Sequence, residues 1–149
     1  LNSKKYLSLF NTHTGEHLDV CYCQDGVYRS GALNRIKHIL RDHRTGDIKA
    51  IDTRVLDILY TLSRQLDTPG PFHIISGYRS AATNAALHRI SKGVATHSFH
   101  TRGMAIDFRV PNCKTSAVHT AAVKLRAGGV GYYPKSDFVH VDCGPVRYW

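Results

Sequence analysis

Two short segments in the second half of the chain each combine an apolar face with an ionisable face. In residues 103–110 the apolar positions are Met104, Ile106, Phe108 and Val110, and the alternate positions are Ala105, Asp107 and Arg109. In residues 138–143 the apolar positions are Val139, Val141 and Cys143, and the alternate positions are Phe138, His140 and Asp142. A period of two is that of a β-strand, whose side chains point alternately to its two faces. We therefore expect two strands that pack a core on one side and present polar groups on the other.

The remaining pattern alternates short strands with helices. Strands are expected at residues 6–10 and 16–22, around a turn at 11–15, and at 72–75, 130–133 and 138–143. Helices are expected at 33–40, at 55–66 after an N-cap at Asp52, at 80–90 with Ser80 as the cap, and at 116–127. With no repeat or linker, residues 1–149 are expected to form a single α+β domain, a small antiparallel sheet flanked by helices.

Composition excludes several classes of protein. Hydrophobic residues make up 42% and charged residues 21% of the 149, values of an ordinary globular chain and not of a disordered one. No window approaches the roughly 20 apolar residues of a membrane-spanning helix, so no integral membrane segment is expected. The first residues contain no apolar signal region, and the chain starts with Leu1, as expected of a processed or trimmed chain.

The chain is strongly basic, with 20 lysines and arginines, 11 acidic residues and a formal charge of +9. A basic surface favours polyanionic partners, such as nucleic acid, anionic lipid or an anionic cell wall. The alternative is a merely soluble basic surface, because the charges are scattered along the chain. Since no helix-turn-helix signal or pattern of interleaved aromatic and basic residues occurs, nucleic acid is not expected as a partner.

Three residues offer a metal site. His100 lies just ahead of the strand that carries Asp107, and His140 lies in the second strand. Two imidazoles and one carboxylate are ligands that zinc prefers, and three protein ligands leave a fourth position open, as in catalytic zinc sites. A lone histidine in a strand is more often structural than a ligand, so the prediction of a metal site depends on the spacing of these three residues.

That spacing is specific. Residues 98–107 read S-x-H-x-x-G-x-A-x-D, and residues 137–140 read D-x-x-H. Together they resemble the LAS zinc peptidases, the group of lysostaphin, the D-Ala-D-Ala metallopeptidases and hedgehog. Within it the chain is most similar to the murein endopeptidase K family, through residues 11–16 (NTHTGE), 41–46 (RDHRTG) and 75–80 (ISGYRS). The resemblance spans roughly residues 7 to 147.

The resemblance implies roles for single residues. His100, Asp107 and His140 would bind Zn²⁺, Asp137 would act as general base, and Arg79 would bind or polarise the substrate carbonyl. Strand alternation, however, places Asp137 on the face opposite His140, so Asp142 remains the alternative base. If Asp137 is the base, Asp142 becomes a hydrogen-bond partner that orients an imidazole. An ion pair that braces the turn is the alternative role for Arg79.

Three further residues are candidates for the substrate cleft: His97, Tyr78 and Tyr132. His97 could approach the metal or the substrate, or be an exposed loop histidine. Tyr132, like Tyr133, could line the cleft or pack the strand.

The function implied by the resemblance is zinc-dependent hydrolysis of amide bonds in peptidoglycan stems or cross-links, as a periplasmic or secreted bacterial endopeptidase. The alternatives are a D,D- or L,D-carboxypeptidase and a non-catalytic, zinc-containing binding module of the same fold. A monomer is expected.

The four cysteines, Cys21, Cys23, Cys113 and Cys143, leave their pairing open. If Asp107 and His140 meet across adjacent antiparallel strands, Cys143 lies opposite about Met104, and Cys113 lies toward the other end. A disulfide between Cys113 and Cys143 is then excluded, because their Cα atoms would lie more than about 7 Å apart. Any disulfide should join one of them to the strand of Cys21 and Cys23.

Overall fold

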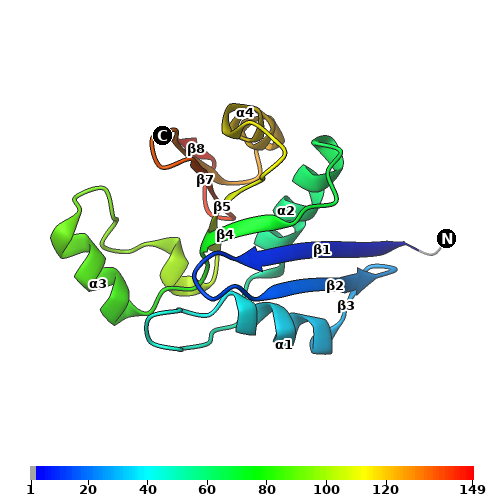
Figure 1. The fold of residues 1–149 in the computed structure, drawn as a ribbon, viewed down its shortest axis with the longest axis horizontal. Helices are drawn as coiled ribbons and strands as arrows, with labels where there is room; N and C mark the ends of the chain where they lie inside the picture. The colour runs from blue at the N-terminus through cyan, green and yellow to red at the C-terminus, as the bar shows by residue number, and fades with distance from the viewer. Residues whose placement is uncertain (1–2) are drawn as a thin grey trace.

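The computed structural model describes residues 3–149 as one eight-stranded sheet with four α-helices (Figure 1). The strand order is β3-β2-β1-β4-β5-β7-β6-β8. The α+β class is confirmed, and the sheet is mixed rather than antiparallel. Two of its pairs, β1 with β4 and β6 with β8, are parallel.

A hairpin near the start is confirmed. Strands β1 (Lys4–Asn11) and β2 (His17–Gln24) pair antiparallel, and the short β3 (Val27–Tyr28) extends β2 at the edge of the sheet. Helix α1 (Ser30–Ile39) packs against β2. It ends well before Gly46, because residues 41–46 form a turn held by a hydrogen bond from Gly46 N to Asp42 O.

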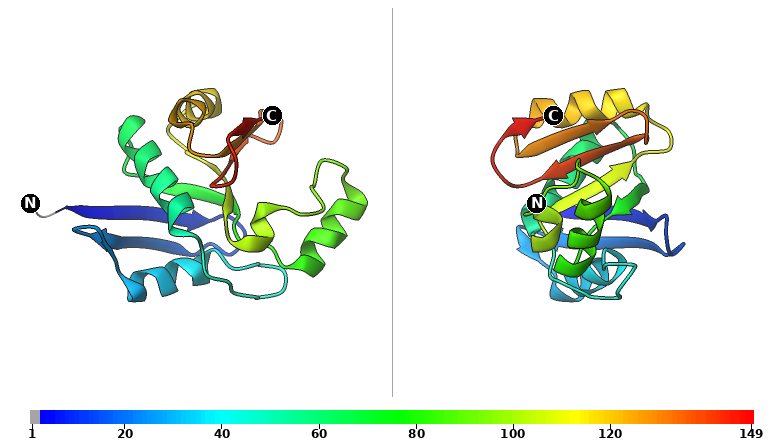
Figure 2. Two further views of the ribbon diagram at one scale, coloured as in Figure 1. Left: turned by 180° about the vertical axis from the view of Figure 1, so that it is seen from behind. Right: turned by 90° about the vertical axis from the view of Figure 1, so that its left-hand side faces the viewer.

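Helices α2 (Thr53–Gln65) and α4 (Thr115–Leu125) contact each other, and both contact β7. Asp52 caps α2 by accepting a hydrogen bond from Arg54 N at 2.9 Å, as the sequence predicted. The view from behind shows α2 crossing the sheet (Figure 2). The helices and the apolar strand faces share one core cluster, whose largest fully buried side chains include Tyr22, Phe72, Phe108, Leu9 and Ile36.

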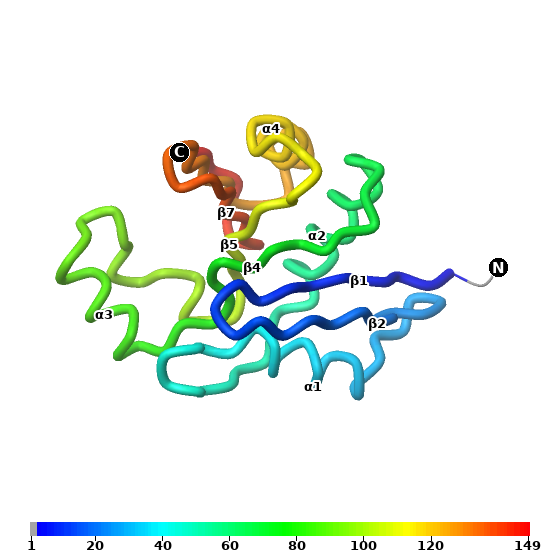
Figure 3. The backbone as a smooth tube through the Cα atoms, in the orientation of Figure 1, coloured from blue at the N-terminus to red at the C-terminus, as the bar shows by residue number. Residues whose placement is uncertain are grey.

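Four elements lead to the polar face: β4 (Phe72–Ser76), α3 (Ala81–Ile90), the 3-10 helix η1 (Phe99–Arg102) and β5 (Ala105–Arg109). Ser80 caps α3 by accepting from Thr83 N at 3.1 Å, as predicted. The tube trace shows α3 and its following loop extending beyond the end of the sheet (Figure 3). Neither η1, β3 nor β8 (Arg147–Tyr148) was predicted.

The expected strand pair is present and has the expected register. Strands β6 (Gly129–Tyr133) and β7 (Phe138–Asp142) form a hairpin, and β7 pairs antiparallel with β5 so that Asp107 lies opposite His140. Cys143 N donates to Met104 O at 3.2 Å, which confirms the predicted position of Cys143. All four cysteines are free thiols in the structure. No helix within residues 3–149 is long and apolar enough to cross a membrane.

Candidate metal centre and substrate cavity

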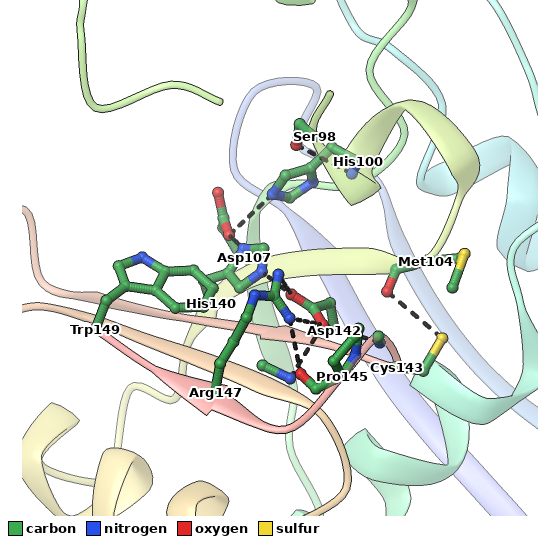
Figure 4. A network of polar contacts seen from close by, with 12 residues as sticks. Ser98, His100, Met104, Asp107, His140, Asp142, Cys143, Pro145, Arg147 and Trp149 are labelled. Atoms are coloured by element: carbon green, nitrogen blue, oxygen red, sulfur yellow. Dashed lines mark hydrogen bonds and ion pairs between the residues drawn. The ribbon is translucent and has the colours of Figure 1, made fainter. Parts of the chain in front are cut away.

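His100, Asp107 and His140 converge on one point of the polar face (Figure 4). His100 comes from η1, Asp107 from the middle of β5 and His140 from the middle of β7. His100 Nε2 lies 3.1 Å from Asp107 Oδ1, and His140 Nδ1 lies 2.8 Å from the same oxygen. All three residues are buried, and one ligand atom from each lies within 4.8 Å of the others.

His100 is positioned by the residues at the two ends of η1, Ser98 and Gly103. Ser98 caps η1 and accepts from His100 N at 3.2 Å. Gly103 ends η1 in the left-handed conformation, with φ of 67°, and a Cβ there would lie 2.3 Å from Ala50 O. Only glycine fits both constraints. The Ser and Gly of the S-x-H-x-x-G motif are therefore explained by backbone geometry.

Hydrogen bonds orient both imidazoles. His100 Nδ1 donates to Gly77 O at 2.8 Å, and His140 Nε2 donates to Asp142 Oδ2 at 2.7 Å. His100 Nε2 then carries a lone pair, and it is buried without a hydrogen-bond partner. His140 Nδ1 lies within hydrogen-bond distance of Asp107 Oδ1, at 2.8 Å. A buried, unpartnered lone pair beside a carboxylate is unfavourable unless a cation lies between them, so this donor set fits a metal ion.

The close contacts among His100, Asp107 and His140 shift the pKa values of Asp107 and His140. Burial opposes ionisation of Asp107, but His100 and His140 hold the pKa of its carboxyl well below the usual value. Burial also opposes protonation of His140, but hydrogen bonds to Asp107 and Asp142 raise its pKa to about 9. Without another cation, a proton on His140 balances the carboxylates. A metal ion that binds here must displace that proton.

Arg79 lies beside the candidate ligands. Its Nη2 is 3.9 Å from Asp107 Oδ2, and its Nη1 donates to Asn84 Oδ1 at 3.0 Å. The side chain is buried, and Nε has no hydrogen-bond partner. Burial lowers the pKa of Arg79, although a guanidinium remains charged in proteins. A fixed cation with an unused donor therefore lines the cavity next to Asp107.

The turn that carries Arg79 is held by Asp42 of the RDHRTG motif and by Leu40, which directly precedes that motif. Asp42 Oδ2 accepts from Ser80 N at 2.9 Å, and Leu40 O accepts from Tyr78 N at 2.8 Å. A Cβ on Gly77 would lie 2.5 Å from Leu40 O, so glycine is required there. Burial opposes ionisation of Asp42, but the backbone hydrogen bond from Ser80, with others, lowers its pKa to about 2. This motif supports the site without entering it.

Asp142 lies directly behind His140. Its side chain is fully buried and also accepts hydrogen bonds from Gly129 N at 3.0 Å and Gly144 N at 2.9 Å. Arg147 contacts both of its carboxylate oxygens. Burial opposes ionisation, but His140 and Arg147 lower the pKa of Asp142. Both of its carboxylate oxygens therefore have protein hydrogen-bond partners, one of which is His140 Nε2.

Asp137 lies elsewhere. It occupies the β6–β7 turn with φ of 57°, and its side chain is 64% exposed. Its Oδ1 accepts a hydrogen bond from the Thr115 hydroxyl at the start of α4, and its Oδ2 lies 3.6 Å from Arg109 Nε. The contact with Thr115 holds this side chain at the start of α4, in a turn to which strand alternation does not apply. The structure does not bring Asp137 to the other predicted site residues.

A cavity of about 480 Å³ opens over the three candidate ligands. His97 lines this cavity, whereas Tyr78 and Tyr132 do not. Tyr78 packs against the core, and Tyr132 stacks on His119 with ring centroids 4.4 Å apart. The neighbouring Tyr133 lines the cavity instead, because alternation turns it to the polar face.

Further cavity residues were not identified from the sequence. They include Phe99, Phe138, Arg147 and Trp149. Trp149 Nε1 donates to Tyr133 Oη at 2.8 Å, and its ring lies 5.0 Å from the His140 ring. The sequence contained only a weak indication of these residues, which is that the one tryptophan of the chain, Trp149, follows Arg147 by two positions.

Comparison with known proteins agrees with this geometry. A family model described as peptidoglycan L,D-endopeptidase MepK matches residues 2–149. The peptidoglycan L,D-endopeptidase MepK of Escherichia coli K12 is 45% identical over 145 residues, which cover 97% of this chain and 80% of that protein. A probable peptidoglycan L,D-endopeptidase MepK of Haemophilus influenzae is 39% identical over 146 residues, 97% of this chain and 78% of that protein. The chain therefore belongs to the MepK family of peptidoglycan L,D-endopeptidases.

Proposed function

We propose that this protein is a zinc-dependent peptidoglycan endopeptidase that hydrolyses amide bonds in cell-wall peptides or cross-links. The observation that carries the proposal is the convergence of His100, Asp107 and His140 on the wall of the cavity, with one possible ligand atom from each within 4.8 Å of the others. The names of the relatives support the substrate class and the L,D bond. They also support the periplasm or cell exterior as its location, where the charge of +9 favours an anionic wall.

His100, Asp107 and His140 are the proposed zinc ligands. Two nitrogens and one oxygen suit Zn²⁺ and leave a position for substrate chemistry. Bound zinc supplies Lewis-acid chemistry to the scissile amide. Asp107 contributes the negative charge of the set, and Asp142 and Gly77 O keep the two imidazoles oriented.

Arg79 is the proposed residue for binding the substrate carbonyl. Its guanidinium is fixed by Asn84, and its Nε lacks a partner within the protein. A preorganised cation stabilises the negative charge that develops on a carbonyl oxygen during amide hydrolysis. The alternative role, an ion pair bracing the turn, uses the same contact with Asp107 at 3.9 Å.

The proton acceptor is assigned to His97. It is an exposed histidine on the cavity wall, and an imidazole nitrogen can act as a general base. Asp137 is the competing assignment, which the resemblance supports. It would have to leave its contacts with Thr115 and Arg109 to reach the cavity.

The test is digestion of a defined peptidoglycan with zinc-loaded and zinc-depleted protein, followed by mass spectrometry of the fragments. Purified protein should bind about one zinc ion and release cross-link fragments only when loaded. Release of single terminal residues would indicate a carboxypeptidase instead. Zinc binding with no cleavage would indicate a binding module, and full cleavage after exhaustive chelation would refute zinc dependence.

His97→Gln and Asp137→Asn decide the proton acceptor. Loss of the assigned group should lower turnover by about 100-fold or more while zinc content stays near one per chain. If Asp137→Asn shows that loss and His97→Gln does not, the role passes to Asp137.

A further inference from the structure

Arg147 forms part of the cavity wall and belongs to β8, the short strand at the edge of the sheet (Figure 4). Its Nη1 donates to Asp142 Oδ1 at 3.1 Å and to Pro145 O at 2.9 Å, and its Nη2 donates to Asp142 Oδ2 at 3.0 Å. The fork of the guanidinium therefore matches both oxygens of the carboxylate that orients His140. A two-point contact of this kind fixes the carboxylate in angle as well as in position.

Two aromatic rings lie close to the same guanidinium. Its central carbon lies 5.0 Å from the ring centroid of Phe99 and 5.0 Å from that of Trp149. Phe99 immediately precedes His100 on η1, and the Trp149 ring lies 5.0 Å from the His140 ring. Arg147 thus contacts neighbours of both candidate histidine ligands.

Two glycines keep space for this arrangement. A Cβ on Gly129 would lie 2.5 Å from Arg147 Nη1 and 2.6 Å from Asp142 Oδ2. A Cβ on Gly144 would lie 2.6 Å from Phe99 Cζ. The backbone at Gly129 and Gly144 therefore lies so close to Arg147, Asp142 and Phe99 that there is no room for a Cβ atom. An arrangement this close holds the carboxylate in one orientation.

An arginine suits this place better than a lysine. Asp142 is fully buried, and a buried carboxylate that loses its cationic partner is strongly unfavourable. The ammonium group of lysine could restore the charge, but it has neither the planar fork nor flat faces for two rings. The two-point contact of Arg147 with Asp142 uses the planar fork.

We propose that Arg147 is a positioning residue of the metal centre, which holds Asp142, and through it His140, in the orientation that binds the ion. The inference rests on the proposed function, because the ion is zinc there. Arg147 acts through Asp142 and contributes no ligand atom.

The experiment measures the zinc dissociation constant by competition with a chromophoric chelator, for the wild type, Arg147→Lys and Arg54→Lys. Arg54 is the matched control, since it also contacts a carboxylate, that of Asp52, at 2.8 Å and lies on α2. Arg147→Lys should weaken zinc binding by about 10- to 100-fold, the range for lost support of a metal ligand, and Arg54→Lys should leave it unchanged.

A double-mutant cycle with Asp142→Asn tests whether Arg147 affects zinc binding through Asp142. If Arg147 acts through Asp142, adding Arg147→Lys to Asp142→Asn should weaken zinc binding by less than about twofold further. Should Arg147→Lys fail to fold, Phe99→Leu removes one of the two rings and should weaken zinc binding in the same direction.

Different failures have different meanings. A wild type that binds no zinc refutes the proposed function. Wild-type zinc affinity in a folded Arg147→Lys, or in Phe99→Leu where that variant takes its place, refutes the inference alone. A lower melting temperature with unchanged zinc affinity also refutes it, because that result describes a merely structural role.

Discussion

The two faces of the β5–β7 pair share a backbone but differ in almost every other respect. On one face, Ile106, Phe108, Val139 and Val141 are fully buried or nearly so and join the core beneath the helices. On the other face, Asp107, His140 and Asp142 are also buried, but among hydrogen bonds and charges. The apolar face is stabilised by packing, whereas the polar face is built from hydrogen-bonded, ionisable groups that could hold a metal ion. We therefore expect mutations on the apolar face to lower mainly stability and mutations on the polar face to lower mainly function.

The largest expected effect is that of Asp107→Ala on the polar face. Removing the carboxylate that both histidines approach should abolish zinc binding and lower peptidoglycan cleavage by more than about 1,000-fold, since the ion has lost its only anionic ligand. Zinc content and fragment release measure this, with circular dichroism as the check on folding. Retention of stoichiometric zinc would contradict the assignment of the polar face.

Phe108→Ala is the corresponding change on the apolar face. Phe108 is fully buried and packs edge-on against Phe72 with centroids 5.3 Å apart. Truncation should lower the free energy of unfolding by about 3–5 kcal/mol. Urea denaturation gives this value, and zinc affinity at low temperature should change little. If Phe108→Ala lost zinc while remaining folded, the separation of the two faces would be wrong.

Asp42→Asn tests whether the polar support beneath the site contributes stability as the core does. The folded-state pKa of Asp42 is lowered to about 2, so its contribution is present above its unfolded value near 4 and is lost as the pH falls through 2. The shift corresponds to about 2 kcal/mol at pH 7. The difference in unfolding free energy between wild type and variant should therefore shrink between about pH 4 and pH 2. A constant difference across that range would indicate that the charge of Asp42 is not involved.

The smallest expected effect is that of Asp137→Asn. Because this side chain points to the α4 side and is 64% exposed, the substitution should change cleavage by less than about twofold. Steady-state rates and zinc content provide the test, with Asp19→Asn, another exposed carboxylate, as the control. A large loss of turnover with full zinc would show that the β6–β7 turn rearranges toward the cavity.

The sequence was most informative where a period of two residues met a specific motif. Alternation along residues 103–110 and 138–143 placed Asp107 and His140 on the polar faces of two strands. The register followed from the further hypothesis that both bind one metal ion, and the structure has that register. The same reasoning could not predict the parallel pairs, because β1 and β4 are separated by two helices and their contact depends on the packing of the whole core.

The cavity wall was harder to predict for a related reason. Arg147 and Trp149 reach the site only because β8 turns back beside β6, and a strand of two residues leaves no periodic pattern. Phe99 lies within the motif of residues 98–107, yet only the structure shows its ring near Arg147. Contacts that form only when the chain reverses direction cannot be predicted from the spacing of neighbouring residues in the sequence.

The position of β8 has a consequence for how the cavity opens. This strand is at the edge of the sheet and pairs with β6, and the backbone hydrogen bonds of the segment include Trp149 N to Val130 O and Tyr132 N to Trp149 O. Edge segments fray at a lower free energy than central strands, so the amides of residues 147–149 should exchange with deuterium well before those of β5 and β7. The indole beside His140 therefore belongs to a part of the cavity wall that should open at a lower free energy than the part built from β5 and β7.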